Sequence, residues 1–156
     1  MKNGLKPEPT DSLKQKAIEI LLVEDNPGDV ALLQEAIKKS RFPVHISVVD
    51  NGEDALLYLR QRGPYLSAPR PDFILLDLNL PRRDGFEVAE EIKRSSPLSR
   101  IPTLVLTSSN DEADKWKACQ HHLDAYLVKP QQWSQYRHLL TYLEENWMRG
   151  LRPDIA

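Results

Sequence analysis

Short apolar runs and longer amphipathic stretches alternate along the whole chain. The apolar runs are rich in Val, Ile and Leu and end on polar or turn residues, which is typical of strands buried on both faces of a sheet. Five such runs are present: Ala17–Val23, Val44–Val49, Asp72–Asp77, Ile101–Thr107 and Ala125–Val128. We predict that each forms a strand.

The stretches that follow the runs carry apolar residues at helical spacing. Asn26 followed by Pro27 is a typical helix start, with Asn as the cap and Pro at the first helical position. Five helices are expected: Pro27 to about Ser40, Glu53–Arg62, Gly85–Arg94, Asp111–His121 and Gln132–Met148. Strict alternation predicts an α/β fold with a parallel sheet covered on both faces. Right-handed crossovers favour the doubly wound, flavodoxin-like strand order 2-1-3-4-5.

The length of 156 residues predicts a single domain. Residues 1–16 are polar and contain two prolines, so we expect a flexible N-terminal lead-in. Residues 17–148 form the predicted domain. Residues 149–156 form a short C-terminal tail, in which Gly150 and Pro153 stop the last helix.

Composition narrows the class of protein. The net charge of −2 gives no bulk attraction to nucleic acid or to an anionic membrane. No apolar run approaches the ~20 residues that span a bilayer. The single cysteine, Cys119, cannot form an internal disulfide and fits a reducing compartment. The sequence therefore predicts a soluble cytoplasmic protein.

Acidic side chains gather where two neighbouring strands end. Glu24 and Asp25 follow the first strand, and Asp77 ends the third. The predicted strand order places these three carboxylates in one crevice at the switch point of the sheet. Like charges this close repel unless a cation neutralises them. Oxygen ligands with room for waters suit Mg²⁺.

The next two strands add a hydroxyl, Thr107, and an ammonium, Lys129, at the same edge. Taken singly, each of these residues could be a helix-end acid, a turn cap or a solvated strand end. Together they favour a site for a phosphoryl group, with Asp77 as the candidate for its covalent attachment. The six glycines are too far apart for a phosphate-binding loop.

The chain resembles the response-regulator receiver domains of two-component signalling from about Ile18 to Trp147. The resemblance rests on Glu24-Asp25, on Leu-Leu-Asp-Leu-Asn-Leu-Pro at residues 75–81 with Asp-Gly at 84–85, on Thr-Ser at 107–108 and on Tyr-Leu-Val-Lys-Pro at 126–130. It implies that Asp77 accepts a phosphoryl group from a histidine kinase. It also implies that Asp25 and Asp77 ligate Mg²⁺, that Glu24 contributes through water and that the Asn79 carbonyl adds a ligand.

Further roles follow from the same resemblance. Thr107 and Tyr126 would be the switch pair, and the peptide bond before Pro130 would be cis. The protein would not be an enzyme beyond its own phosphorylation and dephosphorylation. The chain is most similar to single-domain regulators that partner bacterial phytochrome kinases. That narrower likeness rests on residues 26–29 (Asn-Pro-Gly-Asp), the Pro-rich loop 67–71, His122 and residues 145–147.

The last predicted helix carries an apolar stripe of Trp133, Tyr136, Leu140, Leu143 and Trp147. Leu139, Tyr142 and Met148 lie off this stripe. A helix that is apolar on more than one face needs a second partner. We predict a homodimer through the helix over 111–121, the strand over 125–128 and the last helix. Trp116, Tyr136, Leu140, Leu143 and Trp147 would form its face.

Two other functional classes stay open at this point. A Mg²⁺-dependent phosphohydrolase that uses an aspartyl-phosphate needs a second acid, commonly two residues after the nucleophile. That position is Asn79, which cannot serve. An interaction domain that works without phosphorylation would not need the acidic pair, Asp77, Thr107 and Lys129 together.

Overall fold

The sheet has the strand order expected from the sequence. The computed structural model describes residues 16–78, 80–82, 84–108, 125–129 and 132–149. Its strands are β1 (Ile18–Val23), β2 (Val44–Val49), β3 (Phe73–Leu76), β4 (Thr103–Thr107) and β5 (Ala125–Val128). They form one five-stranded sheet in the order β2-β1-β3-β4-β5. Every neighbouring pair is parallel, which confirms the doubly wound α/β fold.

The described helices are α2 (Pro27–Ile37), α3 (Gly52–Leu59), α4 (Gly85–Arg94) and α6 (Arg137–Met148). Short 3₁₀ turns cover Gly63–Tyr65, Leu98–Arg100 and Trp133–Tyr136. The helix predicted over Asp111–His121 lies outside the described residues. Within the part of the chain that is described, no helix combines the length and the hydropathy needed to cross a bilayer.

Two helices end earlier than predicted. After Ile37, the amides of Lys39 and Ser40 donate to carbonyls three residues back, so α2 closes in a tighter turn. After α3, Gln61 takes a left-handed backbone with φ of 55°. Residues other than glycine rarely adopt that conformation, which turns the chain away from the helix axis.

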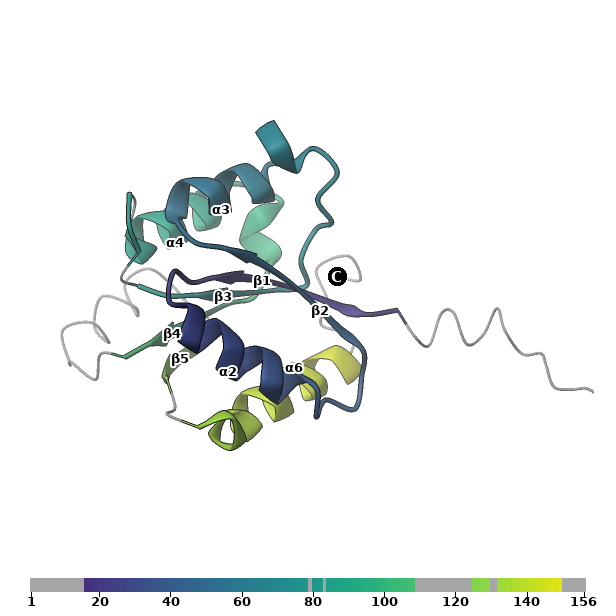
Figure 1. Cartoon of the computed structure of the whole chain (residues 1–156). Coiled ribbons are helices and arrows are strands. Elements are labelled where there is room, and N and C mark those ends of the chain that lie inside the picture. The colour runs from purple at the N-terminus through teal and green to yellow at the C-terminus, as the bar shows by residue number, and fades with distance from the viewer. Residues whose placement is uncertain (1–15, 79, 83, 109–124, 130–131, 150–156) are drawn as a thin grey trace, which may run out of the picture.

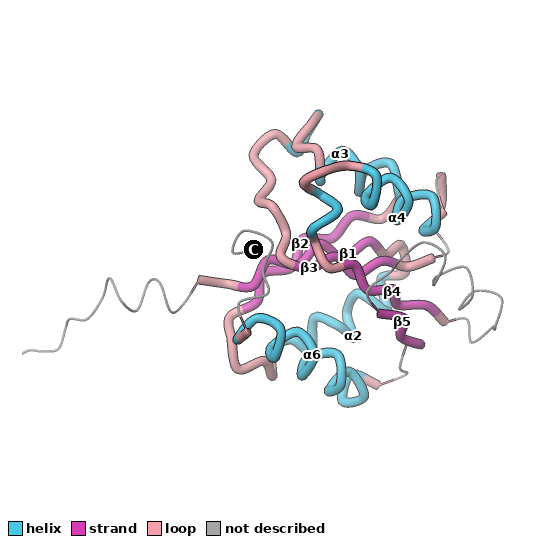
Figure 2. Tube along the Cα trace, turned by 180° about the vertical axis from the view of Figure 1, so that it is seen from behind, coloured by secondary structure: helices cyan, strands magenta, loops and turns pink. Residues whose placement is uncertain are grey.

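Helices cover both faces of the sheet. Figure 1 shows α3 and α4 on one face and α2 and α6 on the other, and the reverse view in Figure 2 agrees. Strand β3 serves both layers, because successive side chains point to opposite faces. Ile74 and Leu76 pack in the cluster with α3 and α4. Phe73 and Leu75 pack in the cluster with α2 and α6. This double burial explains the unbroken apolar run of β3.

The C-terminal helical segment packs differently from the prediction. Tyr136 and Leu143 are buried in the cluster with α2, and Leu140 and Trp147 pack against that cluster. Tyr136 and Leu143 are therefore core residues and are not available to a second copy, contrary to the predicted dimer face. Leu139, expected off the stripe, is buried beside them. Leu139 is buried because the apolar face of a helix in a globular protein spans about 100° or more and so includes positions that flank the central stripe.

One buried acid ties α6 to the connection between α2 and β2. Glu144 accepts hydrogen bonds from the Ser40 hydroxyl at 2.9 Å and from the Arg41 backbone amide at 2.6 Å. Its second oxygen accepts from Arg41 Nε at 3.3 Å. A carboxylate that satisfies several donors at once holds two distant segments together.

We expect Glu144→Ala to lower the free energy of unfolding by about 2 kcal/mol, because the Arg41 amide and the Ser40 hydroxyl lose their acceptor. Urea unfolding followed by circular dichroism measures the change. Glu145→Ala, on the exposed neighbour, is the matched control and should leave stability nearly unchanged. Equal losses in the two variants would contradict the proposed clamp.

Candidate functional site

Three carboxylates meet where β1 and β3 end. Glu24 and Asp25 follow β1, and Asp77 follows β3. The Asp77 amide donates to the Val23 carbonyl at 3.0 Å, which extends the strand pairing up to the acidic residue. One oxygen from each carboxylate lies within 4.8 Å of the others. Glu24 and Asp77 are buried, whereas Asp25 is exposed. The structure thus brings together the three acids that the strand order predicted.

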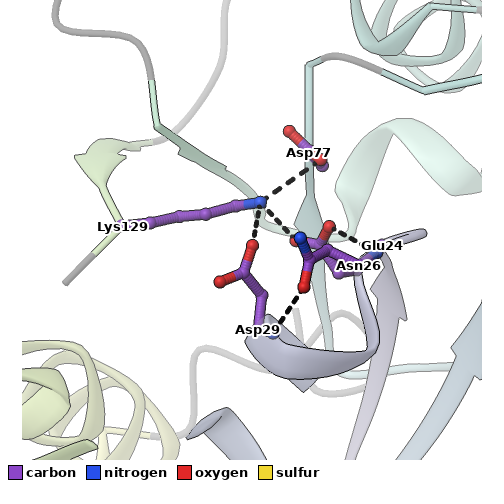
Figure 3. A network of polar contacts seen from close by, with 5 residues as sticks. All are labelled: Glu24, Asn26, Asp29, Asp77 and Lys129. Atoms are coloured by element: carbon purple, nitrogen blue, oxygen red, sulfur yellow. Dashed lines mark hydrogen bonds and ion pairs between the residues drawn. The ribbon is translucent and has the colours of Figure 1, made fainter. Parts of the chain in front are cut away.

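Lys129 reaches into the same place from the end of β5. Its backbone amide donates to the Thr107 carbonyl at 2.7 Å, so the β4–β5 pairing continues through Lys129. Its ammonium nitrogen Nζ lies 2.6 Å from Glu24 Oε1, 2.8 Å from Asp29 Oδ2 and 3.3 Å from Asp77 Oδ2. Figure 3 shows the side chain extended toward these carboxylates, and only 9% of its surface is exposed.

Asp29 is a site residue that our reading of the sequence did not assign. It lies in the first turn of α2, where its amide donates to the Asn26 side chain at 3.1 Å. The backbone amide of Asn26 donates in turn to Glu24 Oε2 at 3.1 Å (Figure 3). In the sequence, the one feature that points to Asp29 is that it is an acid three residues after the helix cap. This feature is weak evidence for a site, because the helix dipole favours acids in the first turn of any helix.

Burial and charge set the protonation of the two central groups. Burial raises the pKa of Glu24 to about 7; the hydrogen bond from Lys129 opposes this rise, and the charge of Asp77 adds to it. Burial by itself would lower the pKa of Lys129. Its hydrogen bonds to Asp29 and Glu24, with the charge of Asp77, outweigh that effect and raise the Lys129 pKa. Lys129 is therefore fully charged at neutral pH.

The remaining predicted residues fall into two groups. Thr107 ends β4 and is buried, and Tyr126 is half-buried on β5. Tyr126 pairs with Val105 in the parallel register, which places Tyr126 and Thr107 on the same face of the sheet. Asn79 and Pro130, together with Trp116 of the predicted dimer face, lie outside the described residues.

The donor set fits a divalent metal ion. Carboxylate oxygens are the hard ligands that Mg²⁺ and Mn²⁺ take in proteins. Glu24, Asp25 and Asp77 offer three such oxygens within 4.8 Å of one another. The exposure of Asp25 leaves one side of the group open to water.

Gly85, at the start of α4, lies directly against the backbone that carries Asp77. Its amide donates to the Leu78 carbonyl at 2.8 Å. A Cβ at this position would clash with the Asp77 carbonyl oxygen and would lie 2.6 Å from the Leu78 Cα. Both obstacles are backbone atoms that cannot move aside cheaply. The absence of a side chain at Gly85 therefore sets how closely α4 approaches the end of β3.

Residues 20–141 match the response regulator receiver domain family. The curated relative Rcp1 from Synechocystis sp. is 40% identical over 137 residues, which cover 88% of this chain and 93% of the relative. The chain therefore belongs to the response regulator receiver domain family, whose members are signalling proteins that partner histidine kinases and work through phosphorylation.

Solved structures agree with this assignment. The phosphorylated cyanobacterial phytochrome response regulator RcpA is 44% identical with a TM-score of 0.77, over 85% of this chain and 95% of that one. The Mn²⁺-bound form of Rcp1 is 40% identical with a TM-score of 0.74, over 83% and 93%. The bacteriophytochrome response regulator AtBRR is 38% identical with a TM-score of 0.70, over 81% and 91%.

We expect Gly85→Ala to lower the free energy of unfolding by roughly 1–3 kcal/mol and to weaken metal binding, because the added Cβ pushes the Asp77 backbone out of place. Chemical unfolding and titration calorimetry with Mg²⁺ measure the two effects. Gly28→Ala is the control: its Cβ would meet only the Asn26 side chain, at 3.1 Å, on a helix. A Gly85→Ala variant as stable as the control would contradict this packing argument.

The affinity for a divalent metal should rise about tenfold between pH 6 and pH 8. Glu24, with a pKa of about 7, is protonated below that pH and must lose its proton before it can interact with a cation. Calorimetric titration with Mg²⁺ at several pH values measures the slope. Glu24→Gln cannot titrate at this position and should flatten the profile; an equally steep profile in that variant would rule out Glu24 as its cause.

Proposed function

We propose that this receiver domain accepts a phosphoryl group on Asp77 from a histidine kinase and signals by a change of conformation. The observation that carries the proposal is the surroundings of Asp77. Its carboxylate is buried, close to Glu24 and Asp25, and 3.3 Å from the Lys129 ammonium. A nucleophilic carboxylate beside a fixed cation suits phosphoryl transfer, because positioning and charge stabilisation supply most of the catalysis there.

In this reaction an Asp77 carboxylate oxygen forms a bond to phosphorus as the bond from phosphorus to the kinase histidine nitrogen breaks. The electron pair of the broken bond stays on the imidazole. The product on Asp77 is an acyl phosphate. Lys129 faces the oxygens where negative charge accumulates and stabilises them electrostatically.

Mg²⁺ is the metal we propose for the site, held by Glu24, Asp25, Asp77 and the carbonyl of Asn79. When bound, it would neutralise charge on the transferring phosphoryl group. Support comes from the oxygen-only donor set of the three carboxylates. The Mn²⁺-bound structure of Rcp1 supports a divalent ion in a relative of this chain.

Thr107 and Tyr126 form the proposed switch. Thr107, buried at the end of β4, would move its hydroxyl toward the phosphoryl group, and Tyr126 on the neighbouring strand would rotate inward. Their place on one face of adjacent strands supports such coupling. The two side chains would then act as a two-state element whose balance phosphorylation shifts.

A phytochrome-type photoreceptor kinase is the partner we propose. RcpA is described as a cyanobacterial phytochrome response regulator and AtBRR as a bacteriophytochrome response regulator. Both resemble this chain along most of their length. A kinase of that type, together with the single cysteine, fits a cytoplasmic protein.

Homodimerisation remains part of the proposal, with a smaller set of apolar contacts than the sequence predicted. Val128, on the edge strand β5, is 44% exposed, and Met148 at the end of α6 is 56% exposed. Both lie on elements of the proposed dimer face. Exposed apolar side chains on an edge strand favour association.

The phosphoacceptor role is favoured over a phosphohydrolase. The receiver family match supports a signalling protein, and Asn79 stands where such an enzyme would carry its second acid. Sustained turnover of an aryl phosphate would reverse this preference.

We expect the protein to gain one phosphoryl group from acetyl phosphate in the presence of Mg²⁺, as measured by intact mass. Asp77→Asn should show no gain, because the amide cannot act as the acceptor. Asp50→Asn, an exposed acid beyond β2, controls for non-specific modification and should behave like the wild type. A wild-type gain of mass in Asp77→Asn would refute the assignment.

A further inference from the structure

Lys129 has as many hydrogen-bond donors as it has carboxylate partners. An ammonium group carries three N–H donors and no acceptor. Its three contacts in the described structure are to Glu24, Asp29 and Asp77. The contact to Asp77, at 3.3 Å, is the longest. The donor that faces Asp77 is the one that would meet a phosphoryl group there, and the two shorter contacts, to Glu24 and Asp29, restrain movement of the ammonium nitrogen toward it.

Asp29 differs from the other two partners. Glu24 and Asp77 belong to the group of three carboxylates that can hold a metal, and Asp29 does not. The charge of Asp29 is therefore met by Lys129 in this site, with Nζ at 2.8 Å.

The structure also fixes Asp29 firmly. Its backbone amide is bound to the Asn26 cap, and its side chain is only 26% exposed. The buried Tyr136 stands close enough for the charge of Asp29 to contribute, after burial itself, to raising the Tyr136 pKa.

We propose that Asp29 is a positioning residue that holds the Lys129 ammonium away from the phosphoryl group on Asp77 and thereby sets how readily the phosphorylated state forms. Asp29 touches neither the phosphorus nor the metal ligand set; it acts through Lys129. Charge-assisted hydrogen bonds are roughly twice as strong as neutral ones, so replacing the carboxylate by an amide releases much of this hold. The inference rests on the proposed role of Asp77.

The test uses Asp29→Asn, which keeps the size of the side chain and the backbone amide but removes the charge. Beryllium trifluoride with saturating Mg²⁺ serves as the probe, because it mimics a phosphoryl group on a carboxylate without being turned over. We expect Asp29→Asn to need about tenfold less beryllium trifluoride for half-saturation than the wild type. The reason is that the hydrogen bond from Lys129 to an uncharged amide side chain at this position is weaker, so moving the ammonium toward the ligand costs less free energy.

Glu35→Gln is the matched control. It removes the same charge from the same helix, where Glu35 pairs with Lys38 at 2.8 Å on the exposed side. Its half-saturation should equal that of the wild type. Equal or weaker binding by Asp29→Asn, with normal binding by the wild type, would overturn the positioning role alone. A wild type that binds no beryllium trifluoride would overturn the proposed function and this inference with it.

Two further readouts separate a direct hold on Lys129 from general charge repulsion. Repulsion through solvent is screened by salt, whereas a direct contact is screened much less, so the tenfold ratio should persist in about 0.5 M KCl. A ratio that collapses would overturn the inference. In the metal-free protein, the ¹⁵N signal of the Lys129 ammonium should shift in Asp29→Asn and stay in place in Glu35→Gln. An unchanged signal in Asp29→Asn would show that the contact does not exist in solution.

Discussion

Repulsion among carboxylates is the constraint on which the functional edge of this protein depends. Glu24, Asp25 and Asp77 converge there, and Asp29 adds a fourth acid through Lys129. Burial strengthens every charge interaction, because the protein interior screens less than water. The Lys129 ammonium offsets part of the repulsion, but one positive charge cannot balance four acids. Burial is the main cause of the raised Glu24 pKa, and the charge of Asp77 adds to it. A site with an excess of negative charge is ready to take up a cation.

The sheet is what holds the acids together against that repulsion. Backbone hydrogen bonds continue past the strand ends at Glu24, Asp77 and Lys129, so each functional side chain starts from a fixed main-chain position. Strand β3 is buried on both faces, and it cannot shift without disturbing two hydrophobic clusters. Gly85 lets α4 pack directly behind Asp77. The stability of the core thus maintains an arrangement of charges that would otherwise separate.

Most of the fold could be predicted because local signals and tertiary structure agree. The bounds of β2, β5 and α4 match the prediction; α4 starts at a capping box formed by Asp84 and Glu87, which is readable in sequence. The ends of α2 and α3 could not be predicted as well, because they depend on turn geometry beyond the helix. The buried face of the last helix is wider than predicted, because the spacing of apolar residues does not give the width of a buried stripe.

The three carboxylates of the candidate site were predictable for a different reason. Strand order brings the ends of β1 and β3 together whatever the details of packing. The contact between Asp29 and Lys129 could not be predicted in this way, since 100 residues separate the two and only side-chain geometry joins them.

Glu24 links the two halves of this site. It accepts the shortest contact of Lys129, at 2.6 Å, and it is also one of the three carboxylates grouped closely enough to bind a metal. An oxygen engaged with a cation is a weaker acceptor for an ammonium, because its charge is already partly neutralised. A metal ion that binds Glu24 would therefore weaken the contact between Glu24 and Lys129, and the contacts of Lys129 to Asp29 and Asp77 would become more important. Lys129 contacts both of these acids, so a closer contact to one weakens its contact to the other. This balance would link metal binding at the three carboxylates to the positive charge beside Asp77.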